Sequence, residues 1–356
     1  MSRYNRHIIL SDVGAKGQQL ISKAKVLVVG AGGLGCPVLQ YLTAAGVGQI
    51  GIIDFDIVET SNLQRQILFG TASLGKNKAL AAKERLKDLN PTIHIEAYPK
   101  MLSPKNAITL FEEYDIVVDG TDNFETRYLV NDASVITKTP VVYGAIYKFE
   151  GQVSVFNYNN GPSYRCLFPK APAKGTVPNC SEIGVLGVLP GIIGTMQANE
   201  VIKIILGFKG VLSGKLLCYD AKSANSYMLK IQRNEAEIAR VRAAQKKFEL
   251  LAFDLNCESD LEISISQLGQ FNNVVFIDVR EDHEQPKLIL DNVIGIPLKQ
   301  FEERLEEIPK NKNIIVFCQS GVRSKDAVSQ LRKHQITNSF SLKEGVFALT
   351  NQHIES

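Results

Sequence analysis

The feature that most constrains the fold is a glycine turn that follows a buried strand. Residues 25–30 read KVLVVG, a β-branched run that ends in glycine and is typical of a buried parallel strand. The sequence GAGGLG follows at 30–35, and we expect a helix from about residue 33 to 45. Glycines allow a tight turn and let the backbone approach phosphate groups, whose charge the helix N–H groups attract. The candidate nucleotide-binding glycines are therefore Gly30, Gly32, Gly33 and Gly35.

Strands and helices alternate beyond this turn. The next strands are expected at 49–54, 94–97, 114–119 and 141–143, with helices at 76–89 and 124–136. Such alternation predicts an α/β fold with a doubly wound, mostly parallel, Rossmann-like sheet. A strand at 152–156, a helix at 192–206 and a returning hairpin at 215–219 and 227–231 are expected to follow.

A second, smaller α/β unit is expected near the C-terminus. Residues 234–250 contain no proline or glycine and are expected to form a charged helical connector, after which strands are expected at 274–278 and 314–317. A length of 356 residues suits two domains. We place the boundary near residue 245, which gives domains of 1–245 and 246–356.

Charge and hydropathy exclude several classes of protein. The 40 basic and 37 acidic residues give a net charge of +3, without the concentrated basic face that nucleic-acid binding usually needs. The most apolar segment, 183–196, is interrupted by glycine and proline and is shorter than the roughly 20 residues of a membrane span. The N-terminus lacks an apolar secretion signal. We therefore expect a cytoplasmic protein that binds neither membranes nor nucleic acid directly.

The residues around the glycine turn indicate which nucleotide is bound. Asp54 ends the second strand about 20 residues farther on, where an acid can bind ribose hydroxyls. The turn and this acid alone favour NAD or FAD, and a turn that binds nothing is the other alternative. However, SNLQRQ at 61–66 and Lys78 could place cations over the nucleotide. DGTDN at 119–123 lies at the carboxyl end of the fourth strand, where a carboxylate can hold Mg²⁺. Cations and magnesium suit phosphoryl or nucleotidyl transfer, whereas hydride transfer needs neither.

A second glycine-rich segment has the spacing of a P-loop without its chemistry. Residues 70–76 read GTASLGK, but the next residue is Asn77 instead of the serine or threonine that binds magnesium. No buried strand leads into this segment. We do not expect it to bind phosphate.

These motifs together resemble a known family. RYNR at 3–6, the glycine turn, DFD at 54–56, SNLQRQ, Lys78 and DGTDN are similar to the MoeB, ThiF and HesA adenylating enzymes, which are relatives of ubiquitin-activating enzyme. The resemblance covers residue 3 to about residue 231. It implies ATP-dependent adenylation of the C-terminal glycine of a ubiquitin-like sulfur-carrier protein that ends in Gly-Gly, with release of pyrophosphate.

The resemblance also assigns roles to individual residues. It implies that Asp54 holds the ribose and that Asn62, Arg65 and Lys78 hold the phosphates. Asp122 would bind Mg²⁺, and Arg6 would be contributed by the second subunit of a homodimer. The same motifs supply three further candidate nucleotide-binding residues, namely Ser61, Gln64 and Asn123.

The six cysteines form no C-x-x-C pair. Many members of the family hold a structural zinc ion with two such pairs, but here Ser163 replaces the first thiol before Cys166, and residues 232–245 contain no cysteine. We therefore expect no zinc site. Cys180 resembles a cysteine that is covalently engaged with the carrier in some relatives, so it is either a catalytic thiol or a bystander. Packing roles are expected for Cys36, Cys218 and Cys257.

The C-terminal unit resembles the rhodanese sulfurtransferases. CQSGVRS at 318–324 turns from a strand into a helix, so that N–H groups at the helix start can surround the Cys318 sulfur, with Arg323 beside it. FIDVRE at 276–281 and KEGV at 343–346 match further rhodanese signatures. The usual H-x-x-G-A-x-N-I-P stretch is reduced to VIGIP at 293–297, and the chain has no tryptophan. An inactive docking module is the alternative to persulfide chemistry.

Both halves together predict one enzyme that makes an acyl-adenylate and converts it into a thiocarboxylate with sulfur from a Cys318 persulfide. A cysteine desulfurase or a similar protein would supply that sulfur. The product could serve the synthesis of molybdopterin, thiamine or an amino acid, or tRNA thiolation. An NAD-dependent oxidoreductase and a non-catalytic carrier-binding scaffold are the alternatives.

Overall fold

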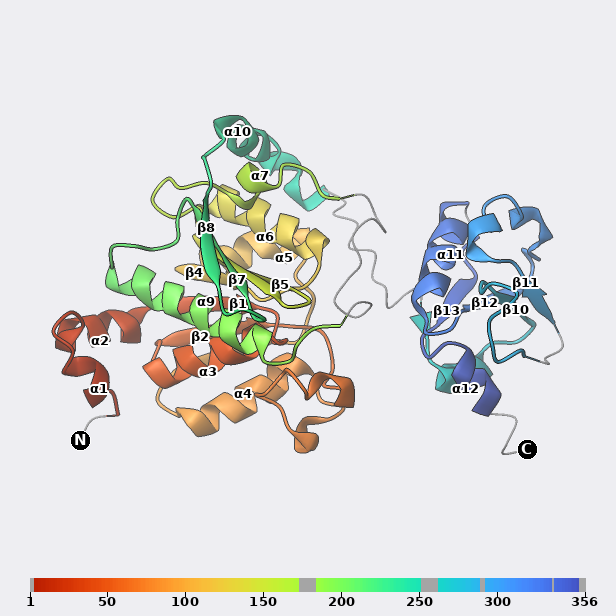
Figure 1. The fold of residues 1–356 in the computed structure, drawn as a ribbon, viewed down its shortest axis with the longest axis horizontal. Coiled ribbons are helices and arrows are strands. Elements are labelled where there is room, and N and C mark those ends of the chain that lie inside the picture. Colours follow the sequence, from red (N-terminus) through yellow and green to blue (C-terminus); the bar gives the residue numbers. More distant parts are fainter. Residues whose placement is uncertain (1–2, 173–183, 251–261, 289–291, 335, 352–356) are drawn as a thin grey trace. The chain divides into compact units, whose positions relative to one another are not determined.

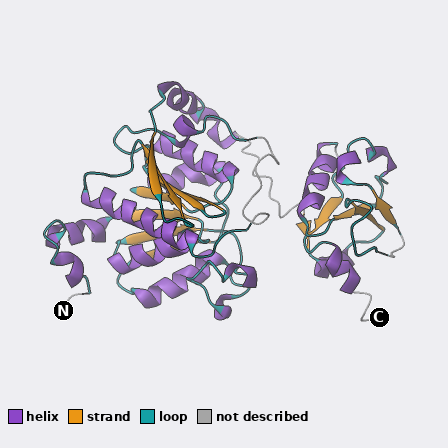
Figure 2. Cartoon of the chain, in the orientation of Figure 1, coloured by secondary structure: helices purple, strands orange, loops and turns teal. Residues whose placement is uncertain are grey.

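The computed structural model divides into two compact units, residues 1–255 and 256–356 (Figures 1 and 2). The residues that it describes are 3–172, 184–250, 262–288, 292–334 and 336–351.

The first unit is built on an eight-stranded sheet. Its strands lie in the order β3 (His94–Tyr98), β2 (Gln49–Ile53), β1 (Lys25–Val29), β4 (Ile116–Asp119), β5 (Val141–Tyr147), β6 (Glu150–Phe156), β7 (Lys215–Asp220) and β8 (Ser226–Lys230). The strands from β3 to β5 are parallel, whereas β6, β7 and β8 are added antiparallel. Because the parallel strands all run the same way, their carboxyl ends form one edge of the sheet.

Helices cover both faces of the parallel half. Val26 and Val28 of β1 pack with α3 (Gly35–Ala45), α4 (Lys78–Leu89) and α9 (Leu189–Leu206). The alternate residue Leu27 packs on the other face with α5 (Pro104–Glu112) and α6 (Phe124–Thr137). In Figure 1, α3 and α4 lie on one side of the strands, and α5 and α6 lie on the other. This arrangement confirms the predicted doubly wound sheet.

The remaining helices lie around this sheet. They are α1 (Asn5–Ile8), α2 (Gly14–Lys23), α7 (Tyr164–Leu167) and α10 (Glu235–Ala243). The predicted connector helix is shorter than expected, because α10 ends at Ala243 and the chain continues as a 3-10 turn, Gln245–Leu250. Its residue Phe248 is buried in the core of the first unit.

The second unit has a five-stranded parallel sheet. Its order is β11 (Val293–Gly295), β10 (Val274–Asp278), β12 (Asn313–Phe317), β13 (Ser339–Leu342) and β9 (Glu262–Ile263). One face packs against α11 (Val322–Lys333), and the other packs with α12 (Val346–Asn351). The expected strands at 274–278 and 314–317 are present as β10 and β12. The helix α11 begins at Val322, directly after residues 318–321, which include Cys318.

Candidate active site

The glycine turn connects β1 to α3 in a conformation that excludes side chains. Gly30 has φ +91°, a left-handed value that favours glycine, and a Cβ built at Gly35 would lie 1.9 Å from the Gly30 carbonyl oxygen. A Cβ built at Gly32 meets no atom closer than 3.9 Å, the distance to Gln66 Nε2. The turn is therefore tight where the chain reverses and open at Gly32, which leaves backbone accessible to a phosphate at the start of α3.

Asp54 faces this turn from the end of β2. Its carboxylate accepts hydrogen bonds from the Ala31 N–H at 2.8 Å and the Asp56 N–H at 2.9 Å. Burial raises the pKa of Asp54 to about 6, against the opposing effect of Lys78. Each oxygen accepts one of these bonds and has capacity for another, so the group can also accept hydrogen bonds from ribose hydroxyls.

Lys78 is the first residue of α4, and its charge lies close enough to Asp54 to lower the pKa of that carboxyl. Asn77 caps that helix through a 3.2 Å bond from the Leu80 N–H. The Lys78 side chain is only 8% exposed, and its ammonium lies 2.9 Å from Asp56 Oδ2. An ammonium has three N–H donors, so the pair with Asp56 leaves donors for a phosphate oxygen.

The segment SNLQRQ packs directly against the turn. A Cβ built at Gly33 would lie 3.6 Å from Arg65 Cγ, so the stem of this arginine passes over the glycine. Arg65 Nη1 donates to the Ser61 carbonyl at 3.0 Å. Asn62 is nearly buried and accepts a bond from the Glu59 N–H at 3.1 Å, which fixes the backbone of the segment. Gln64 packs on the other side, since a Cβ built at Gly187 would lie 2.3 Å from Gln64 Oε1.

The loop between β4 and α6 brings the carboxylate of Asp122 to the carboxyl edge of the parallel strands, where Asp54 also lies. A Cβ built at Gly30 would lie 3.0 Å from the Gly120 carbonyl, so the loop and the glycine turn touch. Asp122 is exposed in this loop. Its neighbour Asn123 caps α6 by accepting a 2.8 Å bond from the Thr126 N–H. Magnesium is usually bound by one or two carboxylates together with phosphate oxygens, and Asp122 fits that role.

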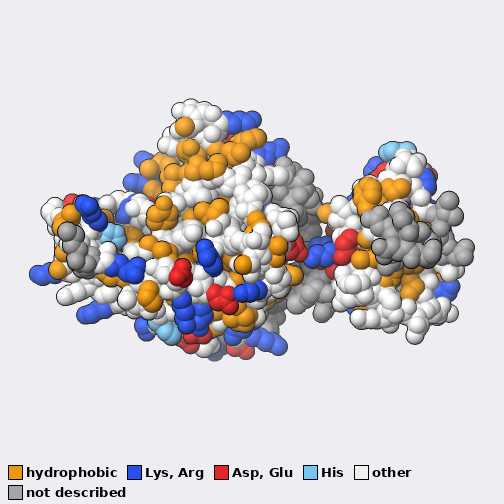
Figure 3. All heavy atoms as spheres, turned by 90° about the horizontal axis from the view of Figure 1, so that it is seen from below, with side chains coloured by type: hydrophobic (Ala, Val, Ile, Leu, Met, Phe, Trp, Pro, Cys, Tyr) orange, Lys and Arg blue, Asp and Glu red, His pale blue; other side chains and the backbone are white. Residues whose placement is uncertain are grey.

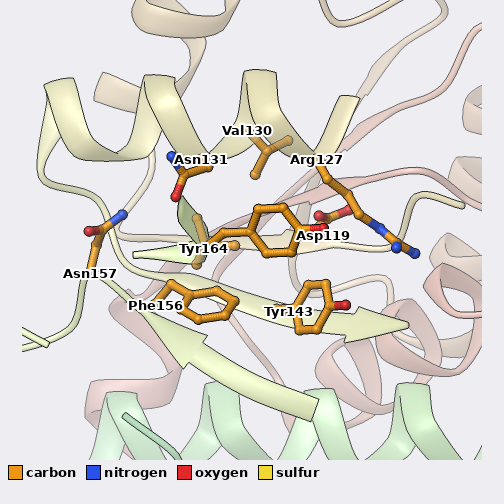
Figure 4. Close-up of a pocket in the computed structure, with 9 residues that line it drawn as sticks. Asp119, Arg127, Val130, Asn131, Tyr143, Phe156, Asn157 and Tyr164 are labelled. Atoms are coloured by element: carbon orange, nitrogen blue, oxygen red, sulfur yellow. The ribbon is translucent and has the colours of Figure 1, made fainter. Parts of the chain in front are cut away.

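Arg127 is a buried cation of this region that sequence reasoning missed. It lies one turn into α6 and donates from Nη2 to the Thr121 carbonyl at 3.1 Å. In Figure 4 its side chain lies beside the Asp119 carboxylate, and its guanidinium carbon is 5.6 Å from the Tyr143 ring centroid. Asp119 accepts bonds from the Thr121 N–H and hydroxyl at 3.0 and 2.6 Å. Burial raises the pKa of Asp119, whereas Arg127 lowers it.

Removal of the Arg127 charge is expected to destabilise the first unit. Arg127→Met removes both the charge that lowers the pKa of the buried Asp119 carboxylate and the bond to the Thr121 carbonyl, a loss of about 2 kcal/mol. Urea unfolding measures the loss, and Asp119→Asn combined with Arg127→Met is expected to recover part of it. A single-variant loss below about 1 kcal/mol would contradict the electrostatic role of Arg127.

Arg6 lies at the opposite edge of the sheet from these groups. It is exposed on α1, next to Tyr4, whose hydroxyl accepts a bond from Asn90 Nδ2 at 2.8 Å. A Cβ built at Gly46, just after α3, would lie 2.4 Å from the Tyr4 ring. Because α3 ends at the amino edge of the parallel strands, the structure does not bring Arg6 to the glycine turn of its own chain.

The cysteines of the first unit have different surroundings. Cys36 and Cys218 are buried, and burial raises the pKa of Cys36 to about 12, so this thiol stays protonated as a packing residue does. The Cys166 sulfur accepts 3.2 Å bonds from the N–H groups of Ser163 and Asn234. The predictions for Cys180 and Cys257 fall outside the described residues.

In the second unit, Cys318 lies between the end of β12 and the start of α11. It is fully buried, and the Ser324 hydroxyl lies 3.6 Å from its sulfur. The Val346 N–H donates to the Cys318 carbonyl at 2.8 Å. A Cβ built at Gly321 would lie 2.3 Å from the Lys343 carbonyl, so the loop is packed against the segment KEGV. The two predicted rhodanese signatures at 318–324 and 343–346 are therefore in contact.

Arg323 forms a bidentate ion pair at the other end of this loop. Its two terminal nitrogens lie 2.6 and 2.7 Å from the carboxylate oxygens of Glu284. The pairing with Arg323 lowers the pKa of Glu284 to about 2, so the carboxylate is ionised at neutral pH. The sequence prediction named Arg323 but not its partner, which is 39 residues away.

No helix among the described residues is long and apolar enough to cross a membrane. On the face that Figure 3 shows, lysine and arginine side chains are interspersed with acidic ones.

The glycine turn, Asp54, Lys78, Arg65 and the loop of Asp122 thus lie together at the carboxyl edge of a doubly wound sheet, an arrangement that suits nucleotide binding. Comparison with known proteins agrees: residues 4–239 match the ThiF family, and residues 265–352 match the rhodanese-like domain. The chain belongs to the ThiF family and has a C-terminal rhodanese-like domain.

One curated relative matches over about two thirds of this chain, and two others match over nearly all of it. A sulfur carrier protein adenylyltransferase of Thermus thermophilus is 52% identical over 239 residues, which cover 66% of this chain and 88% of the relative. A probable adenylyltransferase/sulfurtransferase MoeZ of Mycobacterium tuberculosis is 38% identical over 366 residues, covering 99% and 93%. The adenylyltransferase and sulfurtransferase MOCS3 of Culex quinquefasciatus is 44% identical over 343 residues, covering 92% and 78%.

Among solved structures, Escherichia coli MccB in complex with MccA-N7isoASN is similar in fold. The TM-score is 0.58 at 24% identity, and the match covers 65% of this chain and 72% of MccB. At this identity the likeness concerns the fold.

Proposed function

We propose that this chain uses ATP to adenylate the C-terminal glycine of a ubiquitin-like sulfur carrier, and that a persulfide on Cys318 then converts the adenylate into a thiocarboxylate. The observation that carries the proposal is the convergence of Arg65, Lys78 and the Asp122 loop on the glycine turn. We propose domains of residues 1–245 for adenylation and 246–356 for sulfur transfer in a cytoplasmic protein, with the 3-10 turn that carries Phe248 packed on the adenylation domain. The thiocarboxylate would serve molybdopterin or thiamine synthesis or tRNA thiolation.

In the adenylation step, the carrier carboxylate attacks the α-phosphorus of ATP and pyrophosphate leaves. Two anions must approach each other, so cations have to offset their repulsion. Arg65 and Lys78 would hold the phosphate oxygens, with Asn62 fixing the segment that carries Arg65. Asp54 would accept the ribose hydroxyls. Mg²⁺ held by Asp122 would supply further charge neutralisation at the phosphates. The nucleophile is already ionised at neutral pH, so no general base is assigned.

We further propose that Arg6 completes the site of a partner subunit in a homodimer. The placement of Arg6 at the far edge of its own sheet supports action in trans.

Arg6→Ala and Asp122→Ala would each inactivate both sites of a homodimer. Equal mixing and reassociation give about half heterodimers, in which one of the two sites has both residues. The mixture is expected to recover about a quarter of wild-type pyrophosphate exchange, and no recovery after verified subunit exchange would contradict action in trans.

In the sulfur-transfer step, the terminal sulfur of the Cys318 persulfide attacks the acyl carbon and AMP leaves. The carrier is then joined to Cys318 through an acyl disulfide. A second thiol attacks the Cys318 sulfur, and the thiocarboxylate leaves with the electron pair of the S–S bond. Cys180 is the candidate for this thiol. This attack leaves a disulfide between Cys318 and the second thiol, which an external thiol reductant would reduce while it is itself oxidised to a disulfide. A cysteine desulfurase or a similar protein would then form the Cys318 persulfide again.

ATP–pyrophosphate exchange tests the adenylation half. Labelled pyrophosphate is expected to enter ATP only when a carrier that ends in Gly-Gly and magnesium are both present. The matched control is the same carrier without its last glycine, for which exchange is expected to fall to background. The absence of exchange with every Gly-Gly carrier tested would overturn the proposal.

A further inference from the structure

A segment of the rhodanese-like domain, residues 278–286, contacts the Cys318 loop (residues 318–324) near both ends of that loop. At the first end, Arg280 Nη1 donates to Gln319 Oε1 at 3.4 Å, and Gln319 Nε2 donates to the Gln285 carbonyl at 3.2 Å. At the second end, Glu284 binds Arg323 through both oxygens. The loop that carries the reactive sulfur is thus connected to one segment from two sides.

Two acidic residues of this segment, Asp278 and Glu284, pair with the two arginines at the loop. Arg280 contacts the loop, and Arg323 belongs to it. Arg280, whose side chain is 2% exposed, donates to the two Asp278 oxygens at 2.9 and 2.7 Å. Arg323 is paired with Glu284 at 2.6 and 2.7 Å. Glu284 also accepts a 2.8 Å bond from the Glu281 N–H, which fixes its orientation. Two positive charges face two negative charges, so these four side chains present no net charge to an incoming sulfur donor.

Sulfur donors differ in the charge that the site must accept. Thiosulfate is a dianion: the Cys318 thiolate attacks its outer sulfur, the S–S bond breaks, and sulfite leaves with the electron pair as a second dianion. A free guanidinium beside the sulfur would stabilise both. A persulfide on a donor protein has less charge, leaves as a single thiolate, and is positioned by contacts between the two proteins.

We propose that Glu284 determines donor specificity: by occupying Arg323, it disfavours small dianionic donors such as thiosulfate and leaves the site to protein-bound persulfides. This inference rests on the proposed sulfur transfer by Cys318. Glu284 is paired with Arg323 and is not proposed to contact the sulfur or the donor. It acts through Arg323.

The test is sulfur transfer by the full chain from two donors. One assay supplies thiosulfate with cyanide as the acceptor and measures thiocyanate; the other supplies a cysteine desulfurase with L-cysteine and measures persulfide on Cys318. Glu284→Gln keeps the size of the side chain but removes its charge. The ratio of the two rates, thiosulfate over desulfurase, is expected to rise about tenfold or more, mainly through a lower KM for thiosulfate. Glu284→Asp has a shorter side chain, which cannot reach Arg323 with both oxygens, so a smaller rise in this ratio is expected. This variant replaces Glu284→Gln in the test if the glutamine variant does not fold.

Two controls separate specificity from general disturbance. Glu307→Gln breaks a bidentate pair of the same kind with Arg304, at 2.6 and 2.6 Å in the same domain, and is expected to leave the ratio unchanged. Arg323→Gln combined with Glu284→Gln is expected to abolish the gain, because the gain requires a free Arg323. An unchanged ratio in both Glu284 variants, with normal persulfide uptake from the desulfurase, would overturn this inference alone. Failure of the wild type with both donors would overturn the proposed sulfur transfer as well.

Discussion

Arg65→Met is expected to lower ATP–pyrophosphate exchange by about 10²- to 10³-fold, the usual effect of removing one group that stabilises transition-state charge. Methionine keeps an unbranched stem over Gly33, where Arg65 Cγ lies 3.6 Å from a built Cβ, and removes only the guanidinium. The loss should therefore appear in kcat as well as in the KM for ATP, because the missing charge acts when the carboxylate and the phosphate approach each other.

The matched control for Arg65 is Arg240→Met. Arg240 lies on α10 and is paired with Glu237, without contact to the glycine turn. Its replacement is expected to leave exchange unchanged. An Arg65→Met enzyme that is folded and exchanges pyrophosphate at the wild-type rate would contradict the assignment of Arg65 to the phosphates.

Cys318→Ser is expected to abolish thiocarboxylate formation, by about three orders of magnitude or more, as removal of a catalytic nucleophile does. Serine is slightly smaller and suits a buried position next to the Ser324 hydroxyl, so the loop should stay folded. Pyrophosphate exchange should continue, because the adenylation site lies on the other unit.

The control thiol for Cys318 is Cys166, which accepts backbone hydrogen bonds in the first unit. Cys166→Ser is expected to leave both activities intact. Formation of thiocarboxylate at the wild-type rate by Cys318→Ser would show that the carrier receives its sulfur directly from the external donor, without the rhodanese loop.

The sequence predicted those parts of the fold that depend on local pattern. A β-branched run that ends in glycine predicted β1 and the turn, and the structure shows why two of the glycines are needed: Gly30 has a left-handed φ of +91°, and a Cβ at Gly35 would overlap the Gly30 carbonyl. The helix α5 was not predicted, although Ser103 and Pro104 form a recognisable start signal and Asn106 completes a capping box. The start of α5 is therefore encoded in the local sequence.

Pairings between distant residues could not be read from the chain. Arg127 appeared as an ordinary helical arginine, and only the tertiary fold places it beside Asp119 and the Tyr143 ring (Figure 4). Likewise, Arg323 was predicted beside the sulfur from its place in the loop, but its carboxylate partner Glu284 comes from another segment. Arg323 and Glu284 are 39 residues apart, and no sequence pattern reveals that ion pair. Arg127 and Asp119 are close in the sequence, but only the fold shows that both are buried together.

The central claim is that one chain both activates the carboxylate of the carrier and replaces one of its oxygens with sulfur. The intact mass of the carrier tests this claim most directly. With ATP, magnesium, the desulfurase and L-cysteine, the wild-type enzyme should increase the mass of a Gly-Gly carrier by the difference between one sulfur and one oxygen atom. Without ATP the mass should not change, and without the sulfur donor only the adenylate should form. An unchanged carrier in the complete mixture, or sulfur incorporation without ATP, would contradict this account.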